Sequence, residues 1–330
     1  MRPNEYCIQI LFLLLLLLFL FYEKITGLLY TDNINYMKAR VPQRGPYFFN
    51  TYHKMKIAIQ GETGSFHEVA AMQYFNYDDI DIVPCSTFDL ELSTLKCGEA
   101  DFAVMAIENA RSGSILYNYT LIRESGMKIL GEHNLRIKQN LLALPGQNIT
   151  DIREIRTHPI ALAQCRTFLN QFPGITLIET DDTAGSARQM SETRAKGVAA
   201  IASAHVAEMY GLQVLSSGIE TYKQNYTRFL VVGSEDKGNT RGNKVSICFS
   251  TGHKPGSLAK VLVKLAEFDI NLSKIQSVPR LNGEWEYMFY LDLELNKNTK
   301  SDIIKRVLDK YTSNLEILGV YFKGDMLYES

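Results

Sequence analysis

From residue 55 to residue 233, short apolar runs alternate with predicted helices. Apolar runs of roughly four to eight residues, bounded by turn signals, are typical of buried strands. We assign such strands to residues 56–60, 102–107, 141–144, 176–179 and 199–202. Strands that alternate with helices are typical of βαβ units around a parallel sheet. We therefore predict an α/β fold for this region.

Two strand-to-helix turns in this region are suited to anions. The strand at residues 56–60 is followed by the loop 61–64 and by a helix opened by Ser65, with Glu68 at the spacing of a capping box. The strand at 176–179 leads into another helix, which Thr183 or Ser186 could cap. Backbone N–H groups at such helix starts point towards an anionic ligand.

Polar residues also gather at two strand ends. The strand at 102–107 ends in Glu108 and Asn109, and open α/β sheets place ligands at the carboxyl ends of their strands. Residues 224–229 put amides, a hydroxyl and a guanidinium beside the apolar run 230–232, which is where a ligand site holds polar groups in fixed positions. The alternative is that Thr227 and Arg228 are ordinary residues of an edge strand.

The composition favours a small-molecule partner. The 35 Lys and Arg residues balance 36 Asp and Glu residues, so the chain has no basic excess to attract a nucleic acid. The five cysteines are scattered without metal-ligand spacing, and no Gly-x-Gly-x-x-Gly fingerprint occurs. We therefore expect no metal, no nicotinamide cofactor and reduced cysteines in a cytoplasmic protein.

The N-terminal residues 1–54 differ from the rest of the chain. Residues 10–22 form an unbroken apolar block, which is shorter than the roughly 20 residues of a membrane span and lacks a small-residue cleavage site after it. Met55 directly precedes the first predicted strand. We favour a translation start at Met55, with a membrane anchor through residues 8–22 or a signal peptide as alternatives.

Residues 235–243 are polar and contain glycine, which is typical of a domain linker. Beyond them, residues 244–330 show strands near 245–249, 272–277, 285–293 and 315–321, with helices opened by Ser257 and around 303–308. Asn282-Gly283 between the second and third strands is a hairpin signal. This βαββαβ order is that of a ferredoxin-like domain.

Six motifs occur in the order found in one family. They are GETGSFHEVAA at 61–71, AIENARSGSI at 106–115, HPIALAQCRTFL at 158–169, DTAGSAR at 182–188, AAIASAHVAEMYGL at 199–212 and NYTRF at 225–229. Together they resemble the prephenate dehydratases. The resemblance implies a two-lobed, periplasmic-binding-protein-like α/β catalytic domain at residues 55–234, followed by a C-terminal ACT domain at residues 244–330.

The resemblance also assigns site residues. It implies that Thr227, the threonine of the family's Thr-Arg-Phe motif, is catalytic. Ala110 and Ile160 depart from the serine and glutamine that the family often has there. The sequence leaves open whether Arg228 binds a carboxylate or braces the loop. The implied substrate-binding residues are Glu108, Asn109, Ser112, Thr183, Ala184, Gly185, Ser203, Asn225, Arg228 and Phe229.

The implied reaction is the decarboxylating elimination of prephenate to phenylpyruvate, a carbon–oxygen lyase step towards phenylalanine that needs no cofactor. Two alternatives stay open: the same elimination on arogenate, and a non-catalytic periplasmic-type protein that binds an amino acid or small acid. The resemblance further implies a homodimer or homotetramer.

The resemblance predicts feedback regulation by phenylalanine at the ACT domain. The two loops that bind the effector in relatives correspond to Gly256, Ser257 and Leu258, and to Gln276, Ser277 and Pro279. The second loop lacks both charges of the family's Glu-Ser-Arg-Pro sequence, and Arg280 could partly replace them.

Overall fold

The computed structural model describes residues 54–75, 80–237, 241–280, 286–296, 299 and 301–324. The predictions for residues 1–53 and for the Asn282-Gly283 hairpin lie outside the described residues. Residues 51–330 form one compact unit. Among the described residues, we find no helix whose length and apolar character would let it cross a bilayer.

The first lobe is built on one mixed sheet with the strand order β5-β11-β3-β1-β2. β1 is parallel to β2 and β3, whereas β11 is antiparallel to both of its neighbours, β3 and β5. The short strand β4 pairs with the end of β3. The strands are β1 (Met55–Gln60), β2 (Ile80–Cys85), β3 (Phe102–Asn109), β4 (Gly113–Ser114), β5 (Lys128–Arg136) and β11 (Tyr226–Gly233).

Helices cover both faces of this sheet. α2 (Phe66–Phe75) packs on the face that carries Phe229 and Val231, together with Val104 and Ala106 of β3. α3 (Phe88–Lys96) and α4 (Leu116–Ser125) pack on the face that carries Leu230 and Val232. Successive residues of a strand point to opposite faces, so β11 takes part in two separate cores.

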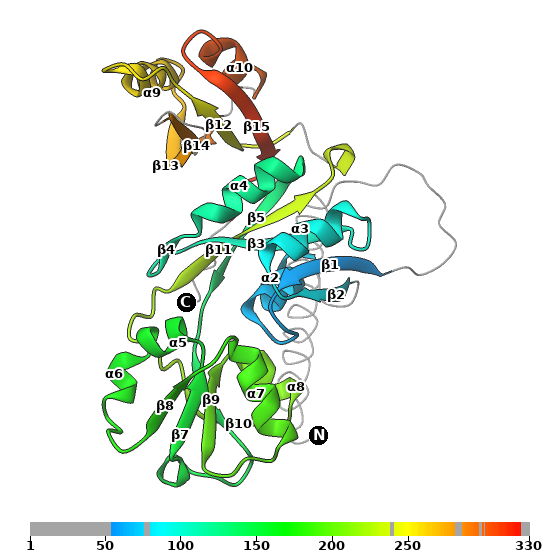
Figure 1. Cartoon of the computed structure of the whole chain (residues 1–330), viewed down its shortest axis with the longest axis vertical. Helices are drawn as coiled ribbons and strands as arrows, with labels where there is room; N and C mark the ends of the chain where they lie inside the picture. The colour runs from blue at the N-terminus through cyan, green and yellow to red at the C-terminus, as the bar shows by residue number, and fades with distance from the viewer. Residues whose placement is uncertain are drawn as a thin grey trace, which may run out of the picture. The chain divides into compact units, whose positions relative to one another are not determined.

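The second lobe has its own sheet, in the order β10-β6-β9-β7-β8. Helices α7 and α8 cover one face of it, and α5 and α6 cover the other (Figure 1). Its strands are β6 (Asn140–Ala143), β7 (Glu154–Thr157), β8 (Thr176–Glu179), β9 (Val198–Ala202) and β10 (Gln213–Ser217). Its helices are α5 (Pro159–Gln164), α6 (Arg166–Leu169), α7 (Thr183–Glu192) and α8 (Ala204–Met209), with a 3₁₀ turn at Ile149–Asp151.

The chain passes from the first lobe to the second after β5 and returns as β11, which lies between β3 and β5. This path divides the region into two α/β lobes, as predicted. The residues before and within β11 are therefore placed where the chain re-enters the first lobe. A 3₁₀ turn at Glu235–Lys237 follows β11.

The C-terminal domain, residues 244–324, has the predicted βαββαβ order and an antiparallel sheet with the strand order β13-β14-β12-β15. This order is ferredoxin-like. Helices α9 and α10 share one core with the sheet and lie on one side of it in Figure 1. The elements are β12 (Lys244–Ser250), α9 (Ser257–Glu267), β13 (Asn271–Arg280), β14 (Glu286–Glu294), α10 (Asp302–Leu308) and β15 (Ser313–Tyr321).

The other face of the C-terminal sheet packs against the first lobe. Met288, Tyr290 and Leu318 share a core with Tyr119 and Ile122 of α4. β15 also pairs with β5 where Gly319 lies opposite Ile129. A Cβ at position 319 would lie 2.0 Å from the Ile129 carbonyl oxygen, so the two strands approach this closely only because residue 319 is glycine. One continuous sheet thus joins the first lobe to the C-terminal domain.

Candidate active site

The strand β11 presents the residues of the Thr-Arg-Phe motif to opposite faces of the first-lobe sheet. Phe229 lies on the α2 face, and the alternation of the strand puts Thr227 on the same face. Arg228 points to the opposite face, towards α4 and the C-terminal domain. Thr227 is buried, with 9% of its surface exposed.

The hydroxyl of Thr227 is held by one neighbouring side chain. Asn109 donates from Nδ2 to Thr227 Oγ1 over 2.9 Å and to Asn225 Oδ1 over 2.9 Å. The Asn109 Oδ1 accepts from the backbone N–H groups of Arg111 and Ser112, both at 2.9 Å. Because Thr227 Oγ1 accepts from Asn109, its own proton is directed to another acceptor. Asn109 therefore orients Thr227 as a hydrogen-bond donor.

A β-bulge sets the directions of these side chains. Along β11, Arg228 pairs with Glu108 but the next residue, Phe229, pairs with Ala106, so β3 has one extra residue at Ile107. Without it, strict alternation from Ala106 would turn Glu108 to the α2 face. The bulge instead aims Glu108 at Arg228 and puts Asn109 beside Thr227. Bulges next to active sites commonly re-aim a side chain in this way.

The predicted residues of the second lobe gather at the starts of α7 and α8. Asp182 caps α7, since its carboxylate accepts from the N–H of Gly185 over 2.7 Å. The prediction that Thr183 or Ser186 caps this helix was wrong; Asp is among the best N-cap residues and precedes the helix directly. Burial raises the pKa of Asp182, and the N–H groups of Gly185 and Ala184 oppose that rise.

Ser203 caps α8, accepting from the N–H of Val206 over 3.3 Å, and it donates to the Gly64 carbonyl over 3.1 Å. The loop between β1 and α2 thus touches the second lobe. Glu62 of this loop forms a two-pronged ion pair with Arg188 of α7, at 2.8 and 2.9 Å. Both side chains are about two-fifths exposed, at 43% and 41%.

The predicted site residues therefore fall into two groups. Glu108, Asn109, Asn225 and Thr227 are joined to one another or to Arg228 in the first lobe. Thr183, Ala184, Gly185 and Ser203 lie at helix starts of the second lobe. In the part of the chain that the structure describes, no hydrogen bond or ion pair joins one group to the other. Ser112 is exposed and joins the first group through its backbone N–H, which donates to Asn109.

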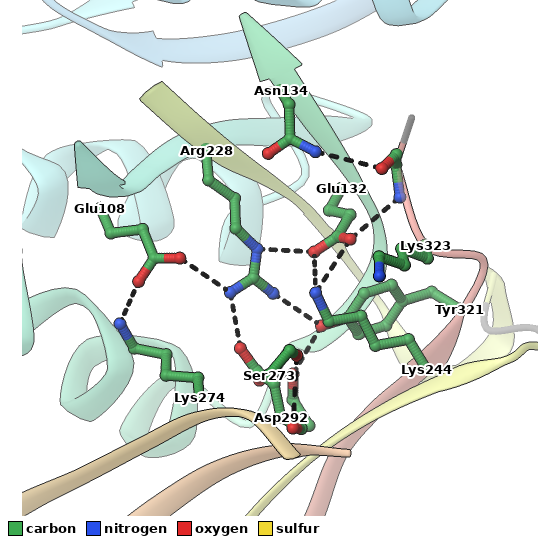
Figure 2. Close-up of polar contacts among 12 residues, drawn as sticks. Glu108, Glu132, Asn134, Arg228, Lys244, Ser273, Lys274, Asp292, Tyr321 and Lys323 are labelled. Atoms are coloured by element: carbon green, nitrogen blue, oxygen red, sulfur yellow. Dashed lines mark hydrogen bonds and ion pairs between the residues drawn. The ribbon is translucent and has the colours of Figure 1, made fainter. Parts of the chain in front are cut away.

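Arg228 occupies the centre of a buried ionic network (Figure 2). Its guanidinium donates to Glu132 of β5 over 2.6 Å and to Asp292 of β14 over 2.5 Å, and it lies 3.5 Å from Glu108. Lys244 pairs with Glu132 at 2.9 Å, and Lys274 pairs with Glu108. Three cations thus meet three carboxylates. The sequence left open whether Arg228 binds a carboxylate of the ligand or braces the loop, and this geometry favours bracing.

Burial and charge oppose each other inside this network. Burial disfavours the charged guanidinium, but Tyr321 and Asp292 outweigh it and raise the pKa of Arg228 well above its ordinary value. Burial likewise disfavours the Asp292 carboxylate, whereas Arg228, Ser246 and Lys244 favour it, so the net effect lowers the pKa of Asp292. Arg228 and Asp292 are therefore both charged at neutral pH.

His67 of α2 packs against the aromatic ring of the Thr-Arg-Phe motif. Its imidazole lies edge-on to Phe229, with ring centroids 5.0 Å apart, and is 5.8 Å from Phe88. The Nε2 atom is buried and has no hydrogen-bond partner among the described residues. Burial lowers the pKa of His67 to about 4, so the imidazole is neutral at physiological pH.

A cavity of about 520 Å³ lies in the C-terminal domain at the start of α9. Gly256, Ser257 and Leu258 line it, with Tyr287 and Phe289 of β14. Of the second predicted loop, Ser277 and Pro279 pair with Phe289 and Tyr287 and share their face. Gln276 pairs with Tyr290 instead, and therefore lies on the face that packs on the first lobe.

The sequence did not reveal several members of the network. Glu132 and Asp292 are charged residues within strands, and such residues usually face solvent. Asp292 lies between Leu291 and Leu293 in the sequence. Its burial could have been inferred only with the knowledge that both faces of its sheet are covered. No group of three or more His, Cys, Asp or Glu side chains that could hold a metal occurs among the described residues.

The chain is similar to known proteins over most of its length. The prephenate dehydratase domain profile matches residues 57–237. An Arabidopsis thaliana protein named arogenate dehydratase/prephenate dehydratase 2, chloroplastic, is 36% identical over 280 residues, covering 81% of this chain and 73% of the relative.

Two solved structures are also similar. A prephenate dehydratase from Arthrobacter aurescens in complex with L-Phe has a TM-score of 0.74 at 28% identity, covering 81% of this chain and 90% of that one. A protein described as a novel type of quorum-quenching acylase, GqqA, has a TM-score of 0.72 at 31% identity, covering 81% of this chain and 97% of that one.

Proposed function

The chain belongs to the prephenate dehydratase family, and on that basis we propose that it converts prephenate to phenylpyruvate on the route to phenylalanine. The observation that carries the proposal is the hydrogen bond that the Thr227 hydroxyl accepts from Asn109. This bond leaves the hydroxyl proton available to an acceptor on the substrate. The enzyme is a lyase that needs no oxidant or reductant.

The reaction balances without a cofactor. The bond between the ring and its carboxylate breaks, and its electron pair enters the ring. The ring carbon–oxygen bond breaks on the far side of the ring, and its pair leaves with the oxygen, which takes one proton and departs as water. Carbon dioxide and phenylpyruvate remain. Aromatisation drives the step, so the protein supplies position and a hydrogen bond to the leaving oxygen.

The charges around the site support a mechanism in which the protein supplies position and a hydrogen bond. A full positive charge beside the departing carboxylate would stabilise the ground state and oppose loss of carbon dioxide. Arg228 is the cation nearest to Thr227 in sequence, and its guanidinium is engaged by protein carboxylates on the other face of the sheet. The proposed contacts for the substrate are Thr183, Ala184, Gly185 and Ser203 at the starts of α7 and α8. In this structure the Gly185 N–H is bonded to Asp182 and the Ser203 hydroxyl to the Gly64 carbonyl, so these two donors would exchange partners on binding.

Arogenate is the second candidate substrate, because the Arabidopsis relative bears both names. It differs from prephenate by an amino group in place of the keto group of the side chain, and it undergoes the same elimination. The test is turnover of prephenate and arogenate by the purified protein, with Thr227→Val in parallel. Product from either substrate that depends on Thr227 supports the proposal; no turnover of either by a folded protein refutes it.

We further propose that phenylalanine binds in the cavity at the start of α9 and regulates the enzyme, which makes residues 244–330 an ACT domain. The Arthrobacter structure is a complex with L-Phe. Tyr287 and Phe289 offer apolar surface to an aromatic ring, and N–H groups at the start of α9 suit a carboxylate. Feedback by the end product is measured as loss of turnover when phenylalanine is added.

We propose a homodimer or homotetramer in the cytoplasm. Among the described strands, β13 has a neighbour on one side only, and Ile275 on it is 45% exposed, so a second copy would cover an open sheet edge. The described cysteines, Cys85, Cys97, Cys165 and Cys248, form no disulfide, which suits a reducing compartment. Size-exclusion chromatography with light scattering measures the assembly.

A further inference from the structure

Two consecutive residue pairs link β3 to β11, and they have different surroundings. The pair Asn109–Thr227 lies at the candidate active site, and the next pair, Glu108–Arg228, lies in the ionic network. Because the pairs are adjacent in one ladder, a displacement of Glu108 or Arg228 moves the backbone that carries Asn109 and Thr227. The position of the catalytic threonine therefore depends on what holds the second pair.

Residues of the C-terminal domain hold both members of that second pair. Asp292 of β14 accepts from Arg228 over 2.5 Å, and Lys274 of β13 pairs with Glu108. Lys274 also donates to Ser114 of β4 over 2.7 Å, which fixes the turn after Asn109. The side chains of Lys274 and Asp292 are 7% and 1% exposed. Figure 2 shows Arg228 between Glu108 and Glu132, with Asp292 below its guanidinium.

Lys274 and Asp292 also form a pair of their own. They lie directly opposite each other in the β13–β14 ladder and therefore share one face of the C-terminal sheet. The opposite face of β14 carries Tyr287 and Phe289, which line the cavity at the start of α9. One strand thus connects that cavity to the side chain that holds Arg228.

From this arrangement we propose that Lys274 and Asp292 are positioning residues for the elimination, acting through Glu108 and Arg228 on the Asn109–Thr227 pair. The inference rests on the proposed function. Neither residue touches the substrate. They fix the two strands whose ends carry the hydrogen bond that orients Thr227, so the first lobe depends on the C-terminal domain for its active geometry.

The test uses Asp292→Asn and Lys274→Met in the full chain. Asn keeps the shape of Asp292 and removes its charge. Glu316→Gln is the control, because Glu316 of β15 also pairs across the two domains, with Arg123 of α4 at 3.4 Å, and no hydrogen bond or ion pair among the described residues joins its side chain to β3 or β11. Misplacement of a catalytic group by about 1 Å costs about 100-fold in rate. We expect kcat to fall about 10- to 100-fold in both test variants, with KM within about 3-fold, and no change in the control.

Thermal unfolding and hydrogen exchange separate positioning from loss of fold. Exchange is read on peptides covering residues 102–109 and 226–233, and we expect faster exchange there in the test variants at temperatures where they are folded. Asp292→Glu, which restores the charge, is expected to recover part of kcat. If Asp292→Asn does not fold, the result for Lys274→Met alone tests the proposal, because the Lys274 side chain lies at the margin of the network.

Each outcome has one meaning. Folded test variants with wild-type kcat and unchanged exchange overturn the proposal, as does an equal loss of kcat in Glu316→Gln. If the wild-type protein turns over neither prephenate nor arogenate, the proposed function fails. In that case the exchange measurement still decides whether Lys274 and Asp292 hold the two strands.

Discussion

Asn109 and Thr227 lie opposite each other in the β3–β11 ladder, and Asn109 Nδ2 donates to Thr227 Oγ1 over 2.9 Å. The bond joins the Glu-Asn and Thr-Arg-Phe motifs, which are 118 residues apart in the chain. It leaves the hydroxyl proton of Thr227 available to another acceptor, which in the proposed mechanism is the leaving oxygen of the substrate, and two predictions depend on it.

The first prediction concerns the hydroxyl itself. Thr227→Val keeps the branched shape and removes the donor, so kcat should fall about 100- to 1000-fold, the usual loss for one donor to a developing charge. Thr227→Ser should keep most of the activity because it retains the hydroxyl. Steady-state kinetics with both substrates measures this. A Val variant within twofold of the wild type would show that Thr227 has another role.

The second prediction concerns the group that orients it. In Asn109→Asp, a carboxylate replaces the amide donor and attracts the Thr227 proton, while the remaining oxygen can still accept from Arg111 and Ser112. We expect kcat to fall about 10- to 100-fold at neutral pH, with KM nearly unchanged. Unchanged kcat in a correctly folded variant would remove Asn109 from the mechanism.

The third prediction compares two arginines. Arg228→Met leaves the buried Asp292 without its ion-pair partner and Glu132 with Lys244 alone, and should lower the free energy of unfolding by about 3–5 kcal/mol. Arg188→Met breaks the exposed pair with Glu62 and should cost about 0–1 kcal/mol. Urea unfolding at pH 7 measures both. Equal costs would mean that the ionic network adds no more stability than a surface pair.

The fourth prediction concerns the cavity of the C-terminal domain. Phenylalanine should raise the midpoint temperature of thermal unfolding because it binds the folded protein. At a hundredfold excess over Kd, binding adds about 2.7 kcal/mol to the free energy of unfolding. Gly256 has a φ of +78°, which side chains rarely adopt, so Gly256→Val should distort the loop and abolish the shift. A shift that survives this change would place the effector elsewhere.

The pattern of apolar runs predicted the α/β fold and the βαββαβ domain because those cores follow the strand and helix periods, whereas the division into two lobes was implied only by the family resemblance. Leu141 and Leu142 show the strand period, since they enter two separate cores on opposite faces of the second-lobe sheet. The strand β5 escaped prediction because it carries Glu132, His133 and Asn134 in succession, and buried polar residues obscure a strand pattern.

The residues of the candidate site were predictable as a set, but their directions were not. The motifs named Glu108, Asn109, Thr227 and Arg228, yet strict alternation gives the wrong face for Glu108 because the bulge at Ile107 shifts the register by one residue. The partners of Arg228 come from β5 and from β14 of another domain. Contacts between such distant segments leave no local signal in a sequence.

The fifth prediction is a pH dependence of stability that originates at His67. Burial lowers its pKa in the folded protein to about 4, against 6.5 in the unfolded chain. Between these values the unfolded chain binds more protons, so stability falls as the pH drops from about 6.5 towards 4. The loss between pH 7 and pH 5 should be about 2 kcal/mol, and His67→Gln, which cannot titrate, should lack it. Urea unfolding of both proteins at the two pH values measures the difference. Equal pH dependence in the two would show that His67 is solvated, and its packing against Phe229 would then not keep the imidazole neutral.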